Sequence, residues 1–238
     1  MMSKRGRLDQ FIAKRLQVSK KAVRQWVINH AVQVDGKDAY GVDQQIDEFS
    51  HIVCNGEVLQ QFVRQYYLLH KPKGVVSATK DDIHATALSL LGLSTEQQAM
   101  MHIAGRLDLQ SSGLLLITND AKWSAALMSP QHKVAKQYLV TVANPLDDNY
   151  APAFAKGMYF DYEGVTTLPA QLTVVSDYQA IVSLHEGKYH QIKRMFGRFR
   201  NPVIELHRFA IGDITLGALK QGEYRALTTA EIAIVSGY

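Results

Sequence analysis

A polar loop bracketed by two glycines holds the charged pair best placed to do chemistry. Arg106 and Asp108 lie between Gly105 and Gly113, just before the apolar run 114–117. That run predicts a strand buried on both faces, so we expect the loop to be held against the core. A carboxylate there is costly unless a cation accompanies it, which predicts a basic partner elsewhere in the chain. The alternative is an aspartate that only fixes a turn.

The segment 186–196 offers a candidate partner. Its apolar residues recur at helical spacing and predict a helix over 190–199. The cationic side of this helix comprises His190, Lys193, Arg194 and Arg198. Lys193 borders both the apolar and the cationic side, as suits a residue that points into a half-buried site. The alternative is a basic helix face exposed to solvent.

Tyr138 opens an alternating strand, 138–142, soon after Lys133 and Lys136. Ordinary packing is one role for it, but a tyrosine beside basic residues can also stack on a nucleobase. Other chemistries find no support in the sequence. Phosphate-binding glycine loops are absent, and the single cysteine and nine histidines show no zinc-ligand spacing. The sequence 111–113, Ser-Ser-Gly, lacks the first glycine of a nucleophile elbow. We therefore expect no metal site.

Charge is unevenly distributed along the chain. Residues 1–24 hold eight Lys or Arg against Asp9, and residues 185–208 hold six against two glutamates, although the net charge of the 238 residues is only +4. Two basic islands in an otherwise acidic protein suggest faces that contact a polyanion. The alternative is two well-solvated helix faces. The lone Cys54 allows no internal disulfide, and no signal-like or membrane-spanning run is present, so we expect a cytoplasmic protein.

The pattern of elements predicts two domains. Apolar residues at helical spacing before and after Ser19, then two Xaa-Gly turns at 35–36 and 55–56, predict a small domain over 1–60. A polar linker, 61–65, follows. In 66–238, strand-like segments (66–69, 75–79, 114–118, 138–142 and 181–184) and helical segments (122–128 and 190–199) do not alternate regularly. This favours an α+β fold with a mixed, mainly antiparallel sheet.

Together these segments resemble the RsuA-type branch of the RNA pseudouridine synthases. The motifs that carry the resemblance are Gly-Arg-Leu-Asp at 105–108, Ser-Gly-Leu-Leu-Leu-Ile-Thr-Asn-Asp at 112–120, Glu-Gly-Lys-Tyr-His-Gln-Ile-Lys-Arg-Met-Phe at 186–196, Leu-His-Arg at 206–208, Gly-Asp-Ile-Thr-Leu at 212–216 and Gly-Glu-Tyr-Arg at 222–225. Residues 7–54 resemble an S4-type RNA-binding module, so the likeness covers nearly the whole chain. Two departures are mild: Ser112 replaces a common Thr, and Ala121 a common Gly.

The resemblance assigns roles by position. Asp108 corresponds to the catalytic aspartate, and Lys193 to the basic residue that ion-pairs with it. Tyr138 corresponds to a tyrosine that packs against the target base, and Arg106 to an arginine that helps fill the gap left by that base. The residues expected to contact RNA, besides Arg106, are Arg5, Arg7, Lys20, Lys21, Arg24, His190 and Arg194.

The implied reaction is isomerisation of one uridine to pseudouridine in small-subunit (16S) ribosomal RNA, at the position 516 site of RsuA-type enzymes, by a monomer without cofactor. The partner is the RNA itself or a small-subunit assembly intermediate. Two alternatives stay open: a synthase acting on large-subunit rRNA, and a non-catalytic RNA-binding or ribosome-assembly protein on the same scaffold.

Overall fold

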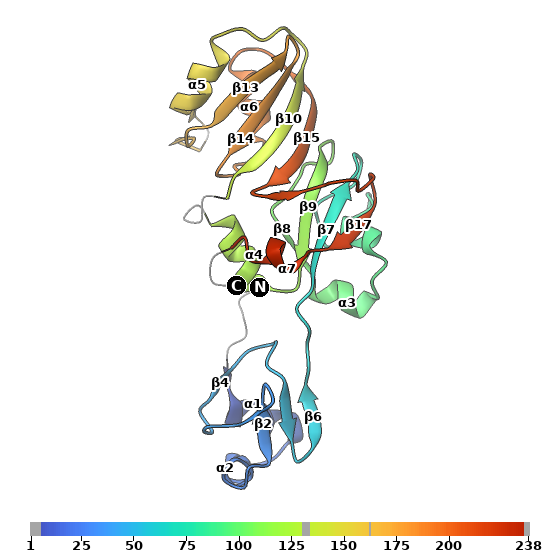
Figure 1. Ribbon diagram of the computed structural model, residues 1–238, viewed down its shortest axis with the longest axis vertical. Coiled ribbons are helices and arrows are strands. Elements are labelled where there is room, and N and C mark those ends of the chain that lie inside the picture. The colour runs from blue at the N-terminus through green and yellow to red at the C-terminus, as the bar shows by residue number, and fades with distance from the viewer. Residues whose placement is uncertain (1–5, 130–133, 162, 236–238) are drawn as a thin grey trace. The chain divides into compact units, whose positions relative to one another are not determined.

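The computed structural model describes residues 6–129, 134–161 and 163–235 (Figure 1). The chain divides into two compact units, residues 1–64 and 65–238. The boundary falls within the polar segment 61–65. Arg5, one of the expected RNA-binding residues, lies outside the described residues.

The first unit contains two short helices and small sheets in its described part. Its elements are β1 (Gly6–Arg7), α1 (Leu8–Leu16), α2 (Lys20–Ile28), β2 (Val32–Val34), β3 (Lys37–Asp38), β4 (Gln45–Ile46), β5 (Ile52–Cys54) and β6 (Glu57–Gln60). Helix α2 begins where the sequence predicts, because the Ser19 hydroxyl accepts a hydrogen bond from the Ala22 amide at 3.2 Å. Leu8, Ile12 and Val23 are fully buried, so both helices face one small core.

The second unit is built on one large twisted sheet. Its elements are β7 (Tyr66–Lys71), η1 (Leu88–Leu91), α3 (Thr95–Met100), β8 (His102–Ala104), β9 (Ser112–Thr118), α4 (Ala121–Met128), β10 (Lys136–Val142), α5 (Tyr150–Lys156), β11 (Tyr159–Phe160), β12 (Val165–Thr166), β13 (Gln171–Ser176), β14 (Gln179–Leu184), α6 (Gln191–Gly197), β15 (Val203–Ile211), β16 (Ile214–Thr215), β17 (Tyr224–Ala226) and α7 (Thr229–Ile232).

The order of strands confirms the predicted fold class. The sheet runs β13-β14-β10-β15-β9-β7-β17, with β16 added beside β15 and β8 beside β9 (Figure 1). Among the described strands, β9 and β15 alone pair in parallel; the other neighbours are antiparallel. The protein is therefore α+β with a mixed, mainly antiparallel sheet.

Strand β9 is buried on both faces, as its apolar run predicts. Leu115 and Ile117 pack in one hydrophobic cluster, while Leu114 and Leu116 pack in another. Strand β10 instead alternates, and its inward residues include Lys136 and Tyr138. Because β10 and β9 flank β15, the predicted catalytic loop and Tyr138 come from strands separated by a single strand.

The predicted strand over 75–79 is wrong. This segment forms only an isolated bridge between Val76 and Thr86. Its polar groups serve other partners: the Ser77 hydroxyl bonds to both the carbonyl and the amide of Leu107, at 2.7 and 3.0 Å. These hydrogen bonds hold the loop that carries Asp108 against the segment 75–79.

Gly113 lies in β9, just after that loop, and pairs with Arg208 of β15. Its φ is +116°, and a Cβ there would lie 2.2 Å from the Arg208 carbonyl oxygen and 2.7 Å from its nitrogen. A side chain would therefore force apart the two parallel strands where they meet, since β15 pairs Arg208 with Gly113. Only glycine combines this dihedral with this close approach.

We expect Gly113→Ala to lower the free energy of unfolding by about 3 kcal/mol or more, because backbone strain and a backbone clash add together. Denaturant unfolding measures this change. Gly197→Ala is the matched control, because a Cβ at Gly197 meets nothing within 4 Å and its φ is not positive. Equal stability of the two variants would contradict the packing described for Gly113.

Candidate active site

A cavity of about 390 Å³ opens in the second unit. Its walls come from the loop 105–111, the strands β10 and β15, and the segment 187–192 that leads into α6. The volume lies in the range of about 300 to 1,000 Å³ that is common for small-molecule sites. Within this cavity the structure gathers Asp108, Tyr138, His190 and Arg106, four residues singled out from the sequence.

Asp108 lies at the mouth of the cavity between two basic side chains. Its Oδ2 is 3.2 Å from Lys193 Nζ, and its Oδ1 is 3.4 Å from His190 Nε2. The Asp108 and Lys193 side chains are each about one third exposed (30% and 32%), so the pair is reachable from solvent yet partly shielded. The arrangement therefore offers a fixed, negatively charged group to a ligand.

The turn before α6 decides which side chains reach Asp108. The predicted helix start at 190 and end at 199 are both wrong: α6 begins at Gln191 and ends at Gly197. His190 is in the left-handed conformation, with φ 49°, so it does not continue the helix. Its ring stacks on Tyr189 with centroids 3.9 Å apart, and Tyr189 itself is 73% exposed. The pair Tyr189–His190 thus presents an aromatic surface beside the catalytic candidate.

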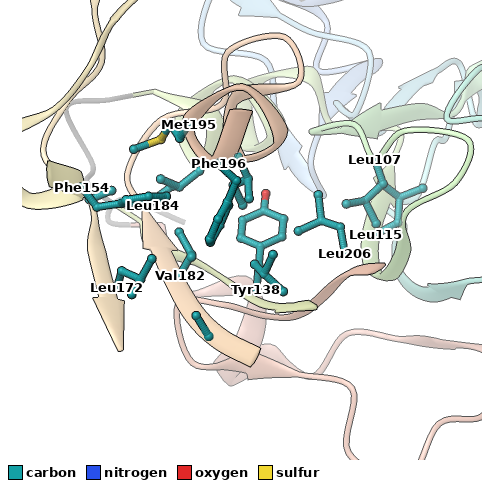
Figure 2. Packing of buried hydrophobic residues seen from close by; sticks show 14 of the residues in the cluster. Leu107, Leu115, Tyr138, Phe154, Leu172, Val182, Leu184, Met195, Phe196 and Leu206 are labelled. Atoms are coloured by element: carbon teal, nitrogen blue, oxygen red, sulfur yellow. The ribbon is translucent and has the colours of Figure 1, made fainter. Parts of the chain in front are cut away.

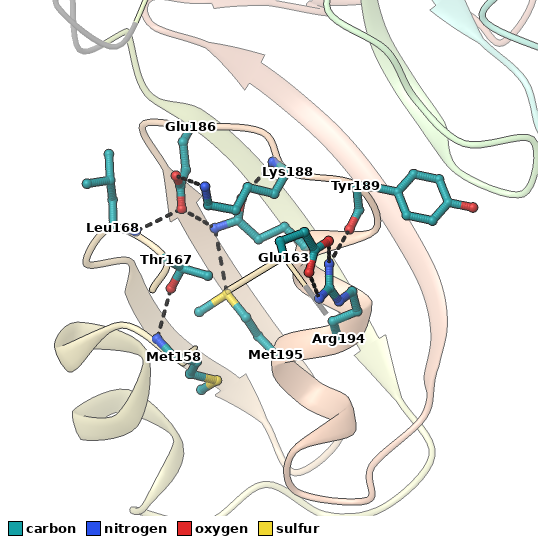
Figure 3. Close-up of polar contacts among 10 residues, drawn as sticks. Met158, Glu163, Thr167, Leu168, Glu186, Lys188, Tyr189, Arg194 and Met195 are labelled. Carbon is teal, nitrogen blue, oxygen red and sulfur yellow. Dashed lines mark hydrogen bonds and ion pairs between the residues drawn. The ribbon is translucent and has the colours of Figure 1, made fainter. Parts of the chain in front are cut away.

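The buried Gln191 and the partly buried Glu186 hold this turn in place (Figure 3). Glu186 accepts hydrogen bonds from the Leu168 amide at 2.8 Å and from Gln191 Nε2 at 2.7 Å, and it pairs with Lys188. Gln191 in turn accepts from the Lys188 amide at 2.9 Å. The residues of this motif therefore fix the turn from which His190 and Lys193 reach Asp108.

The remaining basic residues of the segment point elsewhere. Arg194 forms a two-pronged ion pair with Glu163 and lies over the Phe160 ring, 3.7 Å from its centroid. Arg198 bonds to Asp161 and to the Tyr159 carbonyl. The cationic side predicted for this helix is therefore divided, because only His190 and Lys193 turn to the cavity mouth.

Tyr138 forms part of the inner wall. It is 7% exposed, and its ring lies between Phe196 and Leu206 (Figure 2). Its hydroxyl is 3.5 Å from Arg208 Nη1. A flat ring held in an apolar wall with one polar edge can pack against a nucleobase.

Three buried cations were not expected from the sequence: Arg208 and Lys136 line the cavity, and Lys71 contacts the adjacent loop at Leu109. Arg208 is 1% exposed and donates to the Leu114 carbonyl at 2.8 Å and the Arg106 carbonyl at 3.4 Å, so it holds both ends of the loop that carries Asp108. Lys71 is fully buried and donates to the carbonyls of Pro72, Val75 and Leu109. Burial lowers the pKa of Lys71 to about 8, with Asp108 opposing that shift.

Lys136 is the third missed cation, at 3% exposed in β10. Burial and the neighbouring Arg208 lower its pKa to about 8. The signals in the sequence were weak. Lys71 belongs to a Lys-Pro-Lys-Gly stretch that indicated only a turn, and Arg208 lies in a motif known only by resemblance.

The basic residues of the first unit lie on its surface. Lys20, Lys21 and Arg24 are exposed along α2. Arg7 ion-pairs with Asp9 at 3.0 Å. Arg106 is exposed at the rim of the cavity in the second unit.

The described residues contain no group of three His, Cys, Asp or Glu side chains arranged to hold a metal ion. None of the helices in residues 6–129, 134–161 and 163–235 is both long and apolar enough to cross a membrane.

Comparison with known proteins gives one consistent family. Residues 65–197 match the family model described as RNA pseudouridylate synthase. The chain is 40% identical to a Pseudomonas aeruginosa protein named ribosomal small subunit pseudouridine synthase A, over 96% of this chain and 100% of the relative. It is 42% identical to the Escherichia coli K12 protein of the same name, over 96% and 99%. A solved structure titled "Crystal structure of pseudouridylate synthase" matches with a TM-score of 0.69 and 36% identity, over 96% and 99%.

Proposed function

The chain belongs to the RNA pseudouridylate synthase family, and from this we propose that it isomerises a uridine of small-subunit ribosomal RNA to pseudouridine with Asp108 as the catalytic carboxylate. The family reaction is an isomerisation, because the product contains the same atoms as the substrate. The names of the full-length relatives support the small subunit rather than the large one as the source of the RNA. The nucleotide position stays a prediction.

The reaction needs the target nucleotide to leave its stack. Uracil is bonded to the sugar through N1, and an enzyme must reach C1′ and both ring positions to exchange N1 for C5. A nucleotide is therefore flipped into a pocket, at an expense of a few kcal/mol. The cavity beside Asp108 is large enough to receive it, and the exposed Arg106 at the rim is placed to fill the vacated position.

Asp108 acts where charge develops. When the C1′–N1 bond breaks, the sugar becomes positive, and a fixed carboxylate stabilises that charge or bonds to it. Lys193 and His190 contact the two carboxylate oxygens from different directions, so the carboxylate is held in place before the substrate arrives. Tyr138 supplies the flat wall against which the base packs. The base is detached and reattached in one pocket, so the balance of the reaction requires no redox or group-donating cofactor.

One observation carries this proposal: the aspartate of the matching motif lies at a cavity mouth, held by the lysine of a second motif 85 residues away in sequence. The direct test incubates the purified chain with small-subunit and large-subunit rRNA transcripts and maps pseudouridine by carbodiimide-blocked reverse transcription. We expect one new stop in the small-subunit RNA. A stop only in large-subunit RNA would favour the alternative substrate, and no stop in either RNA would favour a non-catalytic RNA-binding protein.

The first unit is proposed to bind RNA, as the S4-like pattern of residues 7–54 predicts. The exposed Lys20, Lys21 and Arg24 follow one another along α2 and have no acidic residue in the helix to neutralise them. Such a row suits phosphate contacts, which contribute affinity without reading sequence. We also propose that the protein acts as a monomer in the bacterial cytoplasm.

We expect replacement of Lys20, Lys21 and Arg24 together by alanine to weaken RNA binding and to flatten its salt dependence. Three lost phosphate contacts reduce the log–log slope by about 2, at about 0.7 per contact with single-stranded RNA. Filter binding at several salt concentrations measures the slope. Lys156→Ala, an exposed lysine in the other unit, is the control and leaves the slope unchanged. An unaltered slope in the triple variant would show that this helix face is only solvated.

A further inference from the structure

The wall of the cavity formed by β10 and β15 contains two buried cations that form no ion pair with any described residue. Lys136 is 3% exposed and Arg208 1%, and both line the cavity. Within the described part of the chain, the Lys136 ammonium forms no hydrogen bond or ion pair, and Arg208 Nη2 is buried without a partner. The Ser111 hydroxyl, on the same cavity, is also buried and unpartnered. Buried donors without acceptors are rare and call for an explanation.

The charges around the cavity do not balance. Asp108 is the carboxylate among its described lining residues, and Lys193 and His190 already engage it. Lys136 remains mainly protonated at neutral pH, because its lowered pKa is still about 8. A buried cation without a counter-ion is unfavourable, so the wall is suited to a ligand that brings negative charge and acceptor oxygens.

We infer that Lys136 and Arg208 bind the carbonyl oxygens of the flipped uracil and stabilise the negative charge that this ring gains when its bond to C1′ breaks. This inference rests on the proposed function and adds a second half to the site. Asp108 meets the positive sugar, and the wall of β10 and β15 meets the negative base. Fixed charges in a site that excludes water stabilise such charge separation strongly.

The step balances without any further reactant. The C1′–N1 bond breaks and its electron pair stays on the ring, which becomes an anion delocalised over N1 and the carbonyl oxygens. After the ring turns, C5 forms the new bond to C1′. The proton on C5 then leaves, and N1 gains a proton, so atoms and charge are restored. Lys136 and Arg208 are needed for as long as the ring is detached, because they then hold an anion that has no covalent bond to the sugar.

The geometry favours the ring over a phosphate as the occupant. Lys136 and Tyr138 project from the same face of β10, and β15 pairs Arg208 with Tyr138. The cations therefore lie beside the tyrosine proposed to pack against the base. Their burial suits a planar ring inserted between walls, whereas a phosphate on a polynucleotide backbone is suited to cations that are exposed at the surface.

The test uses Lys136, because Arg208 also holds the catalytic loop and its loss would disturb the fold. Lys136→Met keeps the length of the side chain and removes its charge; Lys136→Arg keeps the charge. Calorimetric titration compares uridine 5′-monophosphate with its 6-hydroxy analogue, whose ring is an anion at neutral pH. The two nucleotides carry the same phosphate, so the ratio of their dissociation constants reports the difference between their rings and is independent of phosphate contacts. Lys156→Met serves as the exposed-lysine control.

We expect the wild-type chain and the Lys156→Met control to bind the anionic analogue at least tenfold more tightly than uridine 5′-monophosphate. Lys136→Met should bring the ratio close to one and lower turnover on rRNA at least tenfold, and Lys136→Arg should restore most of both. An unchanged ratio in Lys136→Met would overturn the inference. If both nucleotides also bound more weakly by the same factor, Lys136 would be identified as a phosphate contact. Failure of the wild-type chain to modify rRNA would overturn the proposed function, while the binding ratio would still test the cationic wall.

Discussion

Asp108→Asn is expected to bind RNA with nearly wild-type affinity and to form no measurable pseudouridine. The substitution keeps the size of the side chain and removes the charge that meets the developing positive sugar. Removal of a central catalytic group from an enzyme typically lowers turnover by about 10⁴-fold or more. Single-turnover assays with small-subunit RNA measure the rate, and filter binding measures the affinity.

The matched control is Asp177→Asn, an exposed aspartate in the same unit that should leave both quantities unchanged. Turnover of Asp108→Asn within tenfold of the wild type would remove Asp108 from its role. A large loss of RNA affinity would instead indicate that the substitution disturbs the loop, which thermal unfolding would reveal.

Lys193→Met is expected to lower turnover by about tenfold to a hundredfold while leaving RNA affinity within about threefold. A factor of ten corresponds to about 1.4 kcal/mol. Breaking a fully buried pair costs about 3–5 kcal/mol, but this pair is about one third exposed, so solvent screens part of the effect. His190 also keeps one contact with the carboxylate, at 3.4 Å.

The comparison of turnover with affinity identifies what Lys193 does. Lys156→Met should change neither quantity, because that side chain is exposed on α5. Equal losses of turnover and affinity in Lys193→Met would make Lys193 a phosphate contact. The double variant with His190→Ala should lose more turnover than either single variant, because Asp108 would then have neither of its two side-chain contacts.

The sequence predicted those features that depend on local pattern. The continuous apolar run of β9 indicated its burial on both faces, and Ser19 indicated the start of α2. The spacing of Lys193, on the border of its helix between apolar and cationic sides, suggested a half-buried position, and its side chain is one third exposed. These patterns determine which residues face inward within one element.

Features that depend on long-range pairing could not be predicted in this way. Strand β15 was not expected, yet it lies between β10 and β9 and contributes Arg208. The burial of Lys71 depends on three backbone carbonyls that accept its hydrogen bonds. The burial of Lys136 depends on its position in the cavity wall. A lysine in a sequence carries no sign of such surroundings, because the groups around it come from distant segments.

Two errors show the same limit at short range. The segment 75–79 has the composition of a strand, but Lys71 and the loop at Leu107 take its hydrogen-bonding groups. His190 was assigned to the helix, whereas its left-handed backbone turns it out of α6 beside Asp108. The departure at Ser112 is accommodated, since its hydroxyl pairs with His207 at 2.9 Å. In each case a tertiary contact decides the local structure.

The central claim is that this chain converts a uridine of small-subunit rRNA to pseudouridine through Asp108. Its most direct test maps pseudouridine by carbodiimide-blocked reverse transcription in cells that lack the gene and are supplied with the wild-type chain or with Asp108→Asn. We predict that one small-subunit stop disappears with the gene, returns with the wild-type chain and stays absent with Asp108→Asn. An identical set of stops in all these cells, or a stop restored by Asp108→Asn, would contradict the assignment.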